Sequence, residues 1–132
     1  MRLDRRDFLR LAGTALAAAA AGCGFPHHEE PPRMYGLIGK IKATPGQRDA
    51  LAAILLEGTA DMPGCLSYVI AHDPGDPDAL WITEVWDSRE HHTASLALPA
   101  VQQAIARGRP LIAGFGERFE TQPLGGHGLG IG

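Results

Sequence analysis

The chain lacks what several classes of protein require. It contains no asparagine and only 2 cysteines, it has no block of basic residues after residue 22, and its formal net charge is −3. Two cysteines cannot form a disulfide framework, and a chain without a basic patch does not offer a surface for nucleic acid. Apolar residues still make up 45% of the 132 residues and charged residues 20%. This composition is enough for one packed domain and excludes wholesale disorder.

Residues 1–23 are typical of an export signal. Arg5-Arg6-Asp7-Phe8-Leu9-Arg10 resembles the twin-arginine motif, with arginine at the last position where lysine is usual. The run 11–21 that follows is mostly alanine and is too short to span a bilayer, which takes about 20 residues. A buried amphipathic helix is the alternative reading, but an alanine-rich stretch buries little surface per residue.

The apolar run ends in Ala20-Ala21-Gly22-Cys23, which resembles a lipoprotein cleavage box with Ala20 where leucine is usual. Lipid attachment to Cys23 and plain cleavage nearby both remain open. In either case we expect the working chain to begin near Gly24 in a periplasmic or other extracytoplasmic space. Removing residues 1–22 changes the formal net charge from −3 to −5. An anionic protein is not drawn to an anionic membrane, so membrane attachment would depend on a lipid on Cys23.

Composition divides the rest of the chain into three parts. Residues 24–33 contain three prolines and the pair His27-His28, and we expect a stiff polar linker without a specific metal site. Residues 34–122 form the expected folded domain. Residues 123–132 contain the glycine-rich end of the chain, and we expect them to form a disordered tail.

The domain shows six segments in the order strand, helix, strand, strand, helix, strand. Alternation of apolar and polar residues predicts strands at 35–43, 65–73, 79–87 and about 115–122. Thr44-Pro45-Gly46 predicts the cap and first turn of a helix of about 14 residues, and Ser88 predicts the cap of a second helix that Pro99 interrupts and that ends near Gly108. This order predicts a ferredoxin-like α+β fold, an antiparallel four-stranded sheet with helices on one face.

Alternation also predicts which residues share a face of each strand. In the second strand, Leu66 and Tyr68 are expected on one face and Cys65 on the other. The third strand carries bulky residues on both faces, so we expect it to be central and covered on both sides.

Several segments together resemble the antibiotic biosynthesis monooxygenase (ABM) family, and within it the small quinol monooxygenases. The residues that carry the resemblance are 34–40, 48–51, 62–68, 81–88 and 92–101. The resemblance implies a homodimer in which the sheets of two subunits pack together as an α/β barrel. It also implies oxidation of an electron-rich aromatic molecule by molecular oxygen with no cofactor, because the deprotonated substrate supplies the electrons.

Five residues are candidates for the substrate site. His92 titrates near neutral pH and suits the role of a base that takes a phenolic proton, while Glu84 is either a hydrogen-bonded structural group or an acid–base group. Trp86 and Trp81 are core residues or an aromatic wall for a quinol ring. Tyr68 lies on the paired strand, where its hydroxyl would reach the substrate.

Other residues fit functional roles less well. His91 is expected on the surface, and Cys65 is expected to pack as a small apolar residue.

One branch of the fold degrades haem, but its members need an asparagine on the first strand and a tryptophan on a later helix, and this sequence has neither. No H-x-x-x-H or C-x-x-C motif indicates zinc.

Two classes of function therefore remain. The first is an exported, cofactor-independent monooxygenase that acts on a quinol or similar phenolic molecule. The second is a non-catalytic dimeric module that binds a small molecule or serves a stress response with the same pocket.

Overall fold

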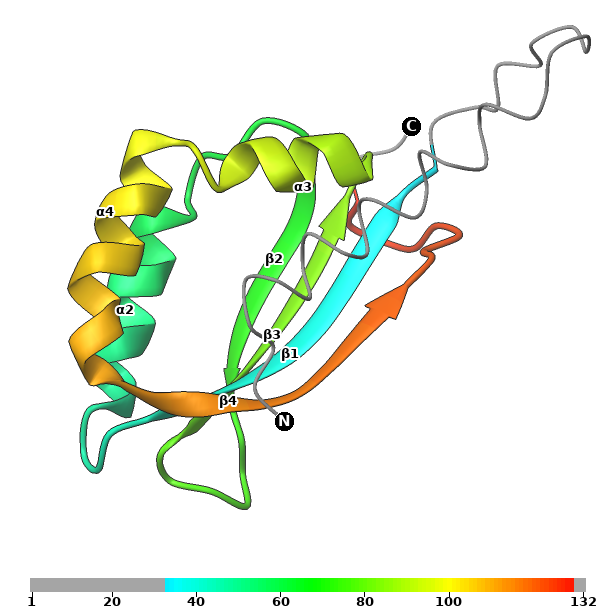
Figure 1. The fold of residues 1–132 in the computed structure, drawn as a ribbon. Coiled ribbons are helices and arrows are strands. Elements are labelled where there is room, and N and C mark those ends of the chain that lie inside the picture. Colours follow the sequence, from blue (N-terminus) through cyan, green and yellow to red (C-terminus); the bar gives the residue numbers. More distant parts are fainter. Residues whose placement is uncertain (1–32, 130–132) are drawn as a thin grey trace, which may run out of the picture. The chain divides into compact units, whose positions relative to one another are not determined.

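The computed structural model describes residues 33–129, which form one α+β unit (Figure 1). The elements, with the labels of Figure 1, are β1 (Tyr35–Ala43), α2 (Arg48–Gly58), β2 (Cys65–His72), β3 (Ala79–Trp86), α3 (Arg89–Ser95), α4 (Pro99–Gly108), a short 3₁₀ turn (Arg109–Leu111) and β4 (Ile112–Thr121). The predicted export signal, Cys23 and all but the last residue of the predicted linker lie outside the described residues.

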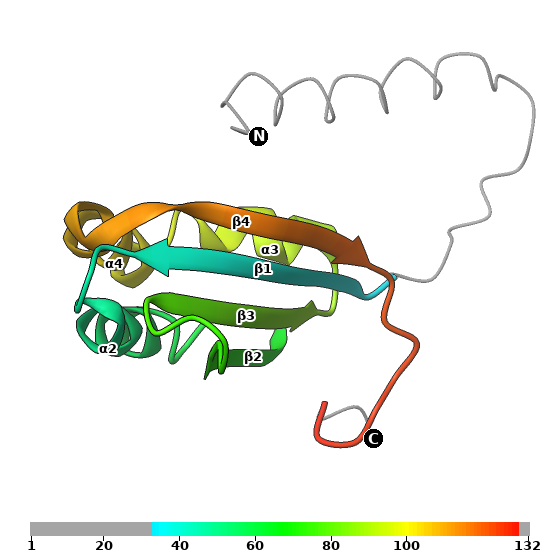
Figure 2. The same ribbon diagram turned by 90° about the horizontal axis from the view of Figure 1, so that it is seen from below.

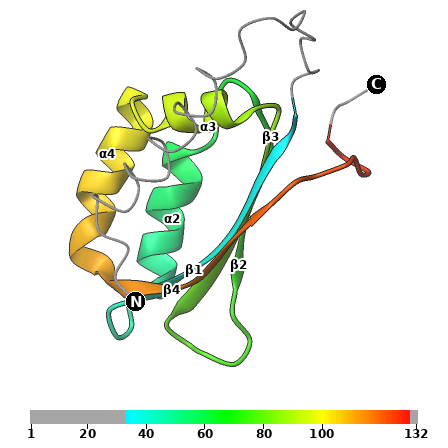
Figure 3. The ribbon, with the colours of Figure 1, turned by 45° about the vertical axis from the view of Figure 1, so that its right-hand side comes forward.

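The four strands form one antiparallel sheet in the order β2-β3-β1-β4 (Figure 2). In its register Tyr35 lies opposite Trp86, and Leu37 lies opposite Glu84. The helices α2, α3 and α4 all lie on one side of the sheet (Figure 3). The prediction of a ferredoxin-like fold with helices on one face is confirmed.

The two helix starts differ in how well the sequence predicted them. Ser88 caps α3 as expected, since its Oγ accepts a hydrogen bond from the backbone N–H of His91 at 3.2 Å. The prediction for Thr44-Pro45-Gly46 is wrong, because these residues form a turn and α2 begins only at Arg48. The N–H of Gln47 closes that turn on the carbonyl of Thr44 at 3.0 Å. Gly46 adopts a φ of 78°, which is not helical, so α2 has 11 residues rather than about 14.

A β-bulge at the start of β2 changes the face of Cys65. Cys65 lies opposite Trp86, but the next paired residue is Ser67 opposite Val85, so β2 has one extra residue here. The extra residue brings Cys65 to the same face as Tyr68, and both pack against the core cluster around Trp86. The expectation that they point to opposite faces is therefore wrong.

The strand β3 is central, as predicted, but residues 33–129 do not cover it on both sides. The described helices cover one face only, and on the other face Thr83 is exposed. A row of residues crosses all four strands on this open face: Phe119, Ile38, Thr83 and Val69. Phe119 is 54% exposed and Val69 53% exposed.

No helix among the described residues has the length and apolar character needed to cross a membrane.

Candidate functional site

His92 occupies a buried position at the end of the sheet where β3 leads into α3. The residue is 7% exposed, although it lies on a helix of only 7 residues. Its imidazole ring meets the indole of Trp86 edge-on with ring centres 5.5 Å apart. The ring of Tyr35 lies on another side, 5.2 Å away and tilted by 46°. Two aromatic rings therefore fix the orientation of the imidazole.

Glu84 lies beside His92 on the face of β3 that is turned to the helices. Its Oε1 accepts a hydrogen bond from the indole N–H of Trp86 at 3.1 Å and lies 4.0 Å from Nε2 of His92. The distance of 4.0 Å is too long for a hydrogen bond, so the two groups are neighbours without being tied together. Burial raises the pKa of Glu84, and the hydrogen bond from Trp86 and the charge of Arg118 partly oppose this effect.

The imidazole of His92 favours its neutral form. Burial lowers the pKa of His92, and the positive charges of Arg118 and Arg89 lower it further, while Glu120 acts in the opposite direction. A neutral imidazole has a nitrogen lone pair that can accept a proton. The arrangement thus supplies a positioned base at neutral pH, next to a carboxyl group that resists ionisation.

A second cluster borders this pair and was not predicted as functional. The hydroxyl of Tyr35 donates to Oε1 of Glu120 at 3.0 Å, and the guanidinium of Arg89 donates to Oε2 of Glu120 at 2.9 Å. Arg89 also lies over the ring of Tyr35, 4.8 Å from its centre. Burial and the bond to Glu120 raise the pKa of Tyr35 to about 12, so its hydroxyl stays a donor. A hollow of about 480 Å³ opens beside these three residues.

Tyr68 joins the site from β2, where it pairs with Glu84 across the strands. Burial raises the pKa of Tyr68, and the carboxylate of Glu84 raises it further. Its hydroxyl therefore remains protonated and able to donate. Burial likewise raises the pKa of the Cys65 thiol, which donates weakly to the carbonyl of Ser67 at 3.5 Å.

The structure brings together His92, Glu84, Trp86 and Tyr68 of the predicted site residues, but not Trp81. Trp81 lies five residues before Trp86 on the same strand, so its side chain points to the opposite face of the sheet. There its indole N–H donates to Oδ2 of Asp73 at 3.0 Å, and Lys40 lies 5.7 Å from its ring.

His91 also lies apart from the site. Its Nδ1 pairs with Oδ1 of Asp87 at 2.6 Å, and its side chain is half exposed. The imidazole packs against the turn at Gly64, where a Cβ atom would collide with it.

No direct signal in the sequence pointed to Tyr35, Arg89 or Glu120 as functional residues. Tyr35 was expected on the first strand and Glu120 on the last, with 84 residues between them. Only the pairing of Leu37 with Glu120 and of Tyr35 with Trp86 brings them beside His92. Among residues 33–129, no group of three or more histidine, cysteine, aspartate or glutamate residues is arranged to hold a metal ion.

Comparison with known families agrees with this fold. The profile of the family described as antibiotic biosynthesis monooxygenase matches residues 34–107. The chain belongs to the antibiotic biosynthesis monooxygenase family. A crystal structure described as a putative member from Chloroflexus aurantiacus is 73% identical, with a TM-score of 0.72, over 74% of this chain and 99% of that one.

More distant ABM structures share the fold. A protein from Nitrosomonas europaea is 15% identical with a TM-score of 0.61, over 73% of this chain and 93% of that one. Another from Caulobacter crescentus is 20% identical with a TM-score of 0.59, over 74% of this chain and 96% of that one. No curated protein matches the chain. Membership of the family and the names of these relatives support a function of the monooxygenase type.

Proposed function

We propose that this ABM protein oxidises a quinol or similar phenolic molecule with molecular oxygen and needs no cofactor to do so. The observation that carries the proposal is a buried imidazole with a lowered pKa, held between two aromatic rings and 4.0 Å from a buried carboxyl group. Such a group takes a proton from a phenol without first having to lose one itself.

In the proposed reaction His92 accepts the proton of a phenolic hydroxyl. The resulting anion is far more reducing toward oxygen than the neutral phenol, and this step makes a bound metal or flavin unnecessary. For a one-ring hydroquinone the overall balance is hydroquinone plus O₂ giving hydroxybenzoquinone plus water. The quinol supplies all four electrons that oxygen takes up, and one oxygen atom enters the product.

The surrounding side chains have distinct proposed roles. The indole of Trp86 is fully buried, so its role is to hold Glu84 and the imidazole of His92 in place behind the substrate. The Tyr68 hydroxyl donates a hydrogen bond to a substrate oxygen. Glu84 provides a second acid–base group at the same place. The positive charges of Arg89 and Arg118, which already disfavour a protonated His92, also favour a developing anion nearby.

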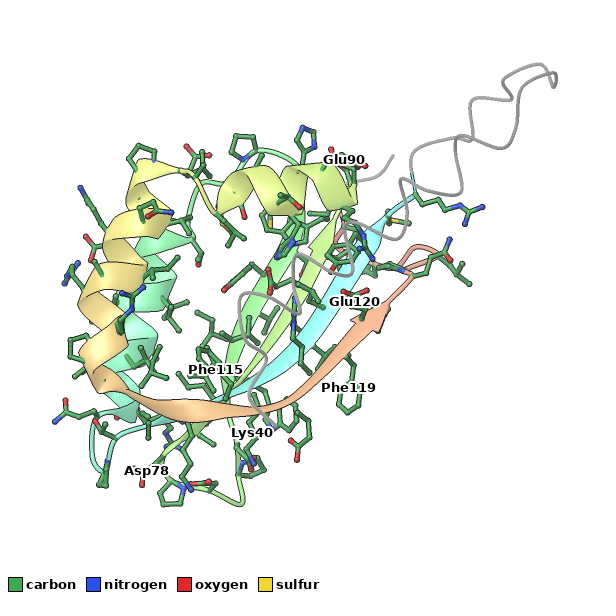
Figure 4. The ribbon with its side chains drawn as sticks, in the orientation of Figure 1. Lys40, Asp78, Glu90, Phe115, Phe119 and Glu120 are labelled. Atoms are coloured by element: carbon green, nitrogen blue, oxygen red, sulfur yellow. The ribbon has the colours of Figure 1, made fainter. Side chains whose placement is uncertain are left out.

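We further propose that the protein is a homodimer formed through the open face of the sheet. The row of Phe119, Ile38, Thr83 and Val69 places two exposed apolar side chains on a face that no described helix covers. Phe119 projects away from the helices (Figure 4). An exposed apolar patch of this kind is typical of an interface.

Export through the twin-arginine signal, with or without a lipid on Cys23, stays part of the proposal.

Oxygen labelling tests the function directly. The mature chain is supplied with hydroquinones under ¹⁸O₂, and oxygen uptake is measured together with the mass of the product. We expect one labelled oxygen atom per product molecule and no accumulation of hydrogen peroxide. Peroxide formed in equal amounts to an unlabelled quinone would mean oxidation without oxygen transfer. If no phenolic substrate promotes oxygen uptake, the protein is instead a binding module of the same fold.

A further inference from the structure

The apolar core is divided into two clusters. One cluster surrounds Trp86 and includes Tyr35 and Leu37, and the other surrounds Leu51 and Leu80. Ile82 lies between them on β3 and is only 6% exposed, yet it belongs to neither cluster. The interruption therefore falls at the level of Ile82 in the sheet.

The residue opposite Ile82 on β1 is Gly39. Its neighbours two positions away, Leu37 and Ile41, both pack in the core on the helix side, so the missing side chain of Gly39 would point the same way. A Cβ atom built there meets no heavy atom within 4 Å outside the adjacent residues. By contrast, a Cβ on Gly108 would come within 3.1 Å of Leu51. Protein interiors are normally close-packed, so Gly39 marks open space between sheet and helices.

This open space adjoins the candidate site. Glu84 is the diagonal cross-strand neighbour of Gly39, and the Cα atoms of such a pair lie about 7–8 Å apart. Arg118 pairs with Gly39 from the other side, on β4. The stretch of β1 from Leu37 to Ile41 spans about 13 Å at 3.3 Å per residue. On the side facing the helices it carries no side chain at its centre, because that position is Gly39. A ring held against His92 and Glu84 would extend along this stretch.

The φ angle of Gly39 does not itself require glycine, and the register shift beside it places the extra residue in β4 rather than in β1. Positive φ angles among the described glycines occur at Gly46, Gly64, Gly125, Gly126 and Gly128, and not at Gly39. A glycine inside a strand lowers stability because it loses more backbone entropy and packs nothing. A glycine that lowers stability, at a position whose φ angle other residues could adopt, is typical of a site that serves function.

We propose that Gly39 determines the size of the substrate, by leaving room for the second ring of a two-ring quinol. The identity of the ligand as a quinol rests on the proposed function. A one-ring quinol bound against His92 and Glu84 does not reach Gly39, whereas a fused two-ring quinol lies over its backbone. A side chain at position 39 therefore excludes the larger ligand and spares the smaller one.

The test compares two quinols and two substitutions at this position. Binding of hydroquinone and of 1,4-dihydroxynaphthalene is measured by calorimetry without oxygen, so that no turnover occurs. We expect Gly39→Val to weaken binding of the two-ring quinol by about tenfold or more, as for an excluded group in an apolar pocket, and to leave hydroquinone binding within about twofold. Gly39→Ala should lie between the parent and Gly39→Val, and should raise Tm because its methyl group enters open space.

Gly114→Val is the matched control. Gly114 also lies on a strand and also has no heavy atom within 4 Å of a built Cβ, but it pairs with Lys42 near the other end of β1. We expect this variant to bind both quinols as the parent does.

The outcomes separate this inference from the proposed function. If the parent binds both quinols and Gly39→Val weakens both equally or neither, the role of Gly39 is wrong and the quinol function stands. A lower Tm for Gly39→Ala would show that the space is filled and would also overturn the inference. If the parent binds neither quinol, the proposed function itself fails.

Discussion

The indole N–H of Trp86 donates to Oε1 of Glu84 at 3.1 Å, between two side chains on the same face of β3. This bond holds the carboxyl group toward His92, whose Nε2 lies 4.0 Å away. Trp86 also contacts the imidazole ring itself. One tryptophan thus positions both titratable groups of the candidate site, and the two groups are pushed in opposite directions, with a lowered pKa for His92 and a raised pKa for Glu84.

Replacing His92 should remove most of the turnover. A positioned general base contributes about 10²–10⁴-fold in rate, and we expect His92→Ala to lower kcat for a quinol by a factor in that range. His91→Ala is the matched control, because His91 is the preceding residue on α3 but is half exposed and pairs with Asp87. Steady-state oxygen uptake measures both. Equal turnover by His92→Ala and the parent would show that His92 is not the base.

The pH dependence of kcat/KM should show an acid limb set by His92. The lowered pKa means that the base stays active below the usual histidine value of about 6.5, and activity is lost only as protonation occurs at lower pH. Arg89→Gln removes a positive charge that lowers this pKa and frees the negative charge of Glu120, which raises it. Both effects act in the same direction, so the acid limb of Arg89→Gln should move to higher pH. A shift to lower pH would contradict the assignment.

Glu84→Gln should separate the structural and chemical roles of this carboxyl group. A raised pKa means that the folded protein binds the proton more tightly than the unfolded chain, so the ionised group weakens stability as pH rises above about 4.5. The amide oxygen of glutamine still accepts from Trp86, and we expect the Tm of Glu84→Gln to equal or exceed that of the parent at pH 7. Reduced turnover in this stable variant indicates chemistry. A large fall in Tm with residual turnover indicates a structural role.

The bond between Tyr35 and Glu120 should contribute measurably to stability. Tyr35→Phe removes the hydroxyl but keeps the ring beside His92, and we expect a loss of about 1–2 kcal/mol in the free energy of unfolding. Urea unfolding of Tyr35→Phe, Glu120→Gln and the double variant gives the coupling between the two groups. Strictly additive effects would mean that the bond contributes nothing in solution.

The proposed dimer predicts sensitivity on the open face of the sheet. Val69→Lys or Phe119→Lys places a charge in the apolar row, and either should shift light scattering at micromolar concentration from twice the mature mass toward the monomer. Leu56→Lys is the control, since Leu56 is 56% exposed but lies on α2 on the helix side. A parent that is already monomeric would rule out this interface.

The sequence alone was sufficient for the order of elements and for one half of the site. Alternation located β1 at its observed ends, Pro99 located the start of α4, and Ser88 located the cap of α3, because each of these signals acts between residues close in the chain. Glu84 and Trp86 on β3 and His92 on α3 are also close along the chain, since β3 and α3 are consecutive.

Tertiary structure decided what lies around those residues. The register between strands placed Tyr35 against His92 and Glu120 against Tyr35, and the bulge after Cys65 moved that residue to the core face. It also left Gly39 opposite Ile82, where the two core clusters do not meet. Register and bulges depend on which strands pair across long stretches of chain, and no local pattern of residues encodes that pairing.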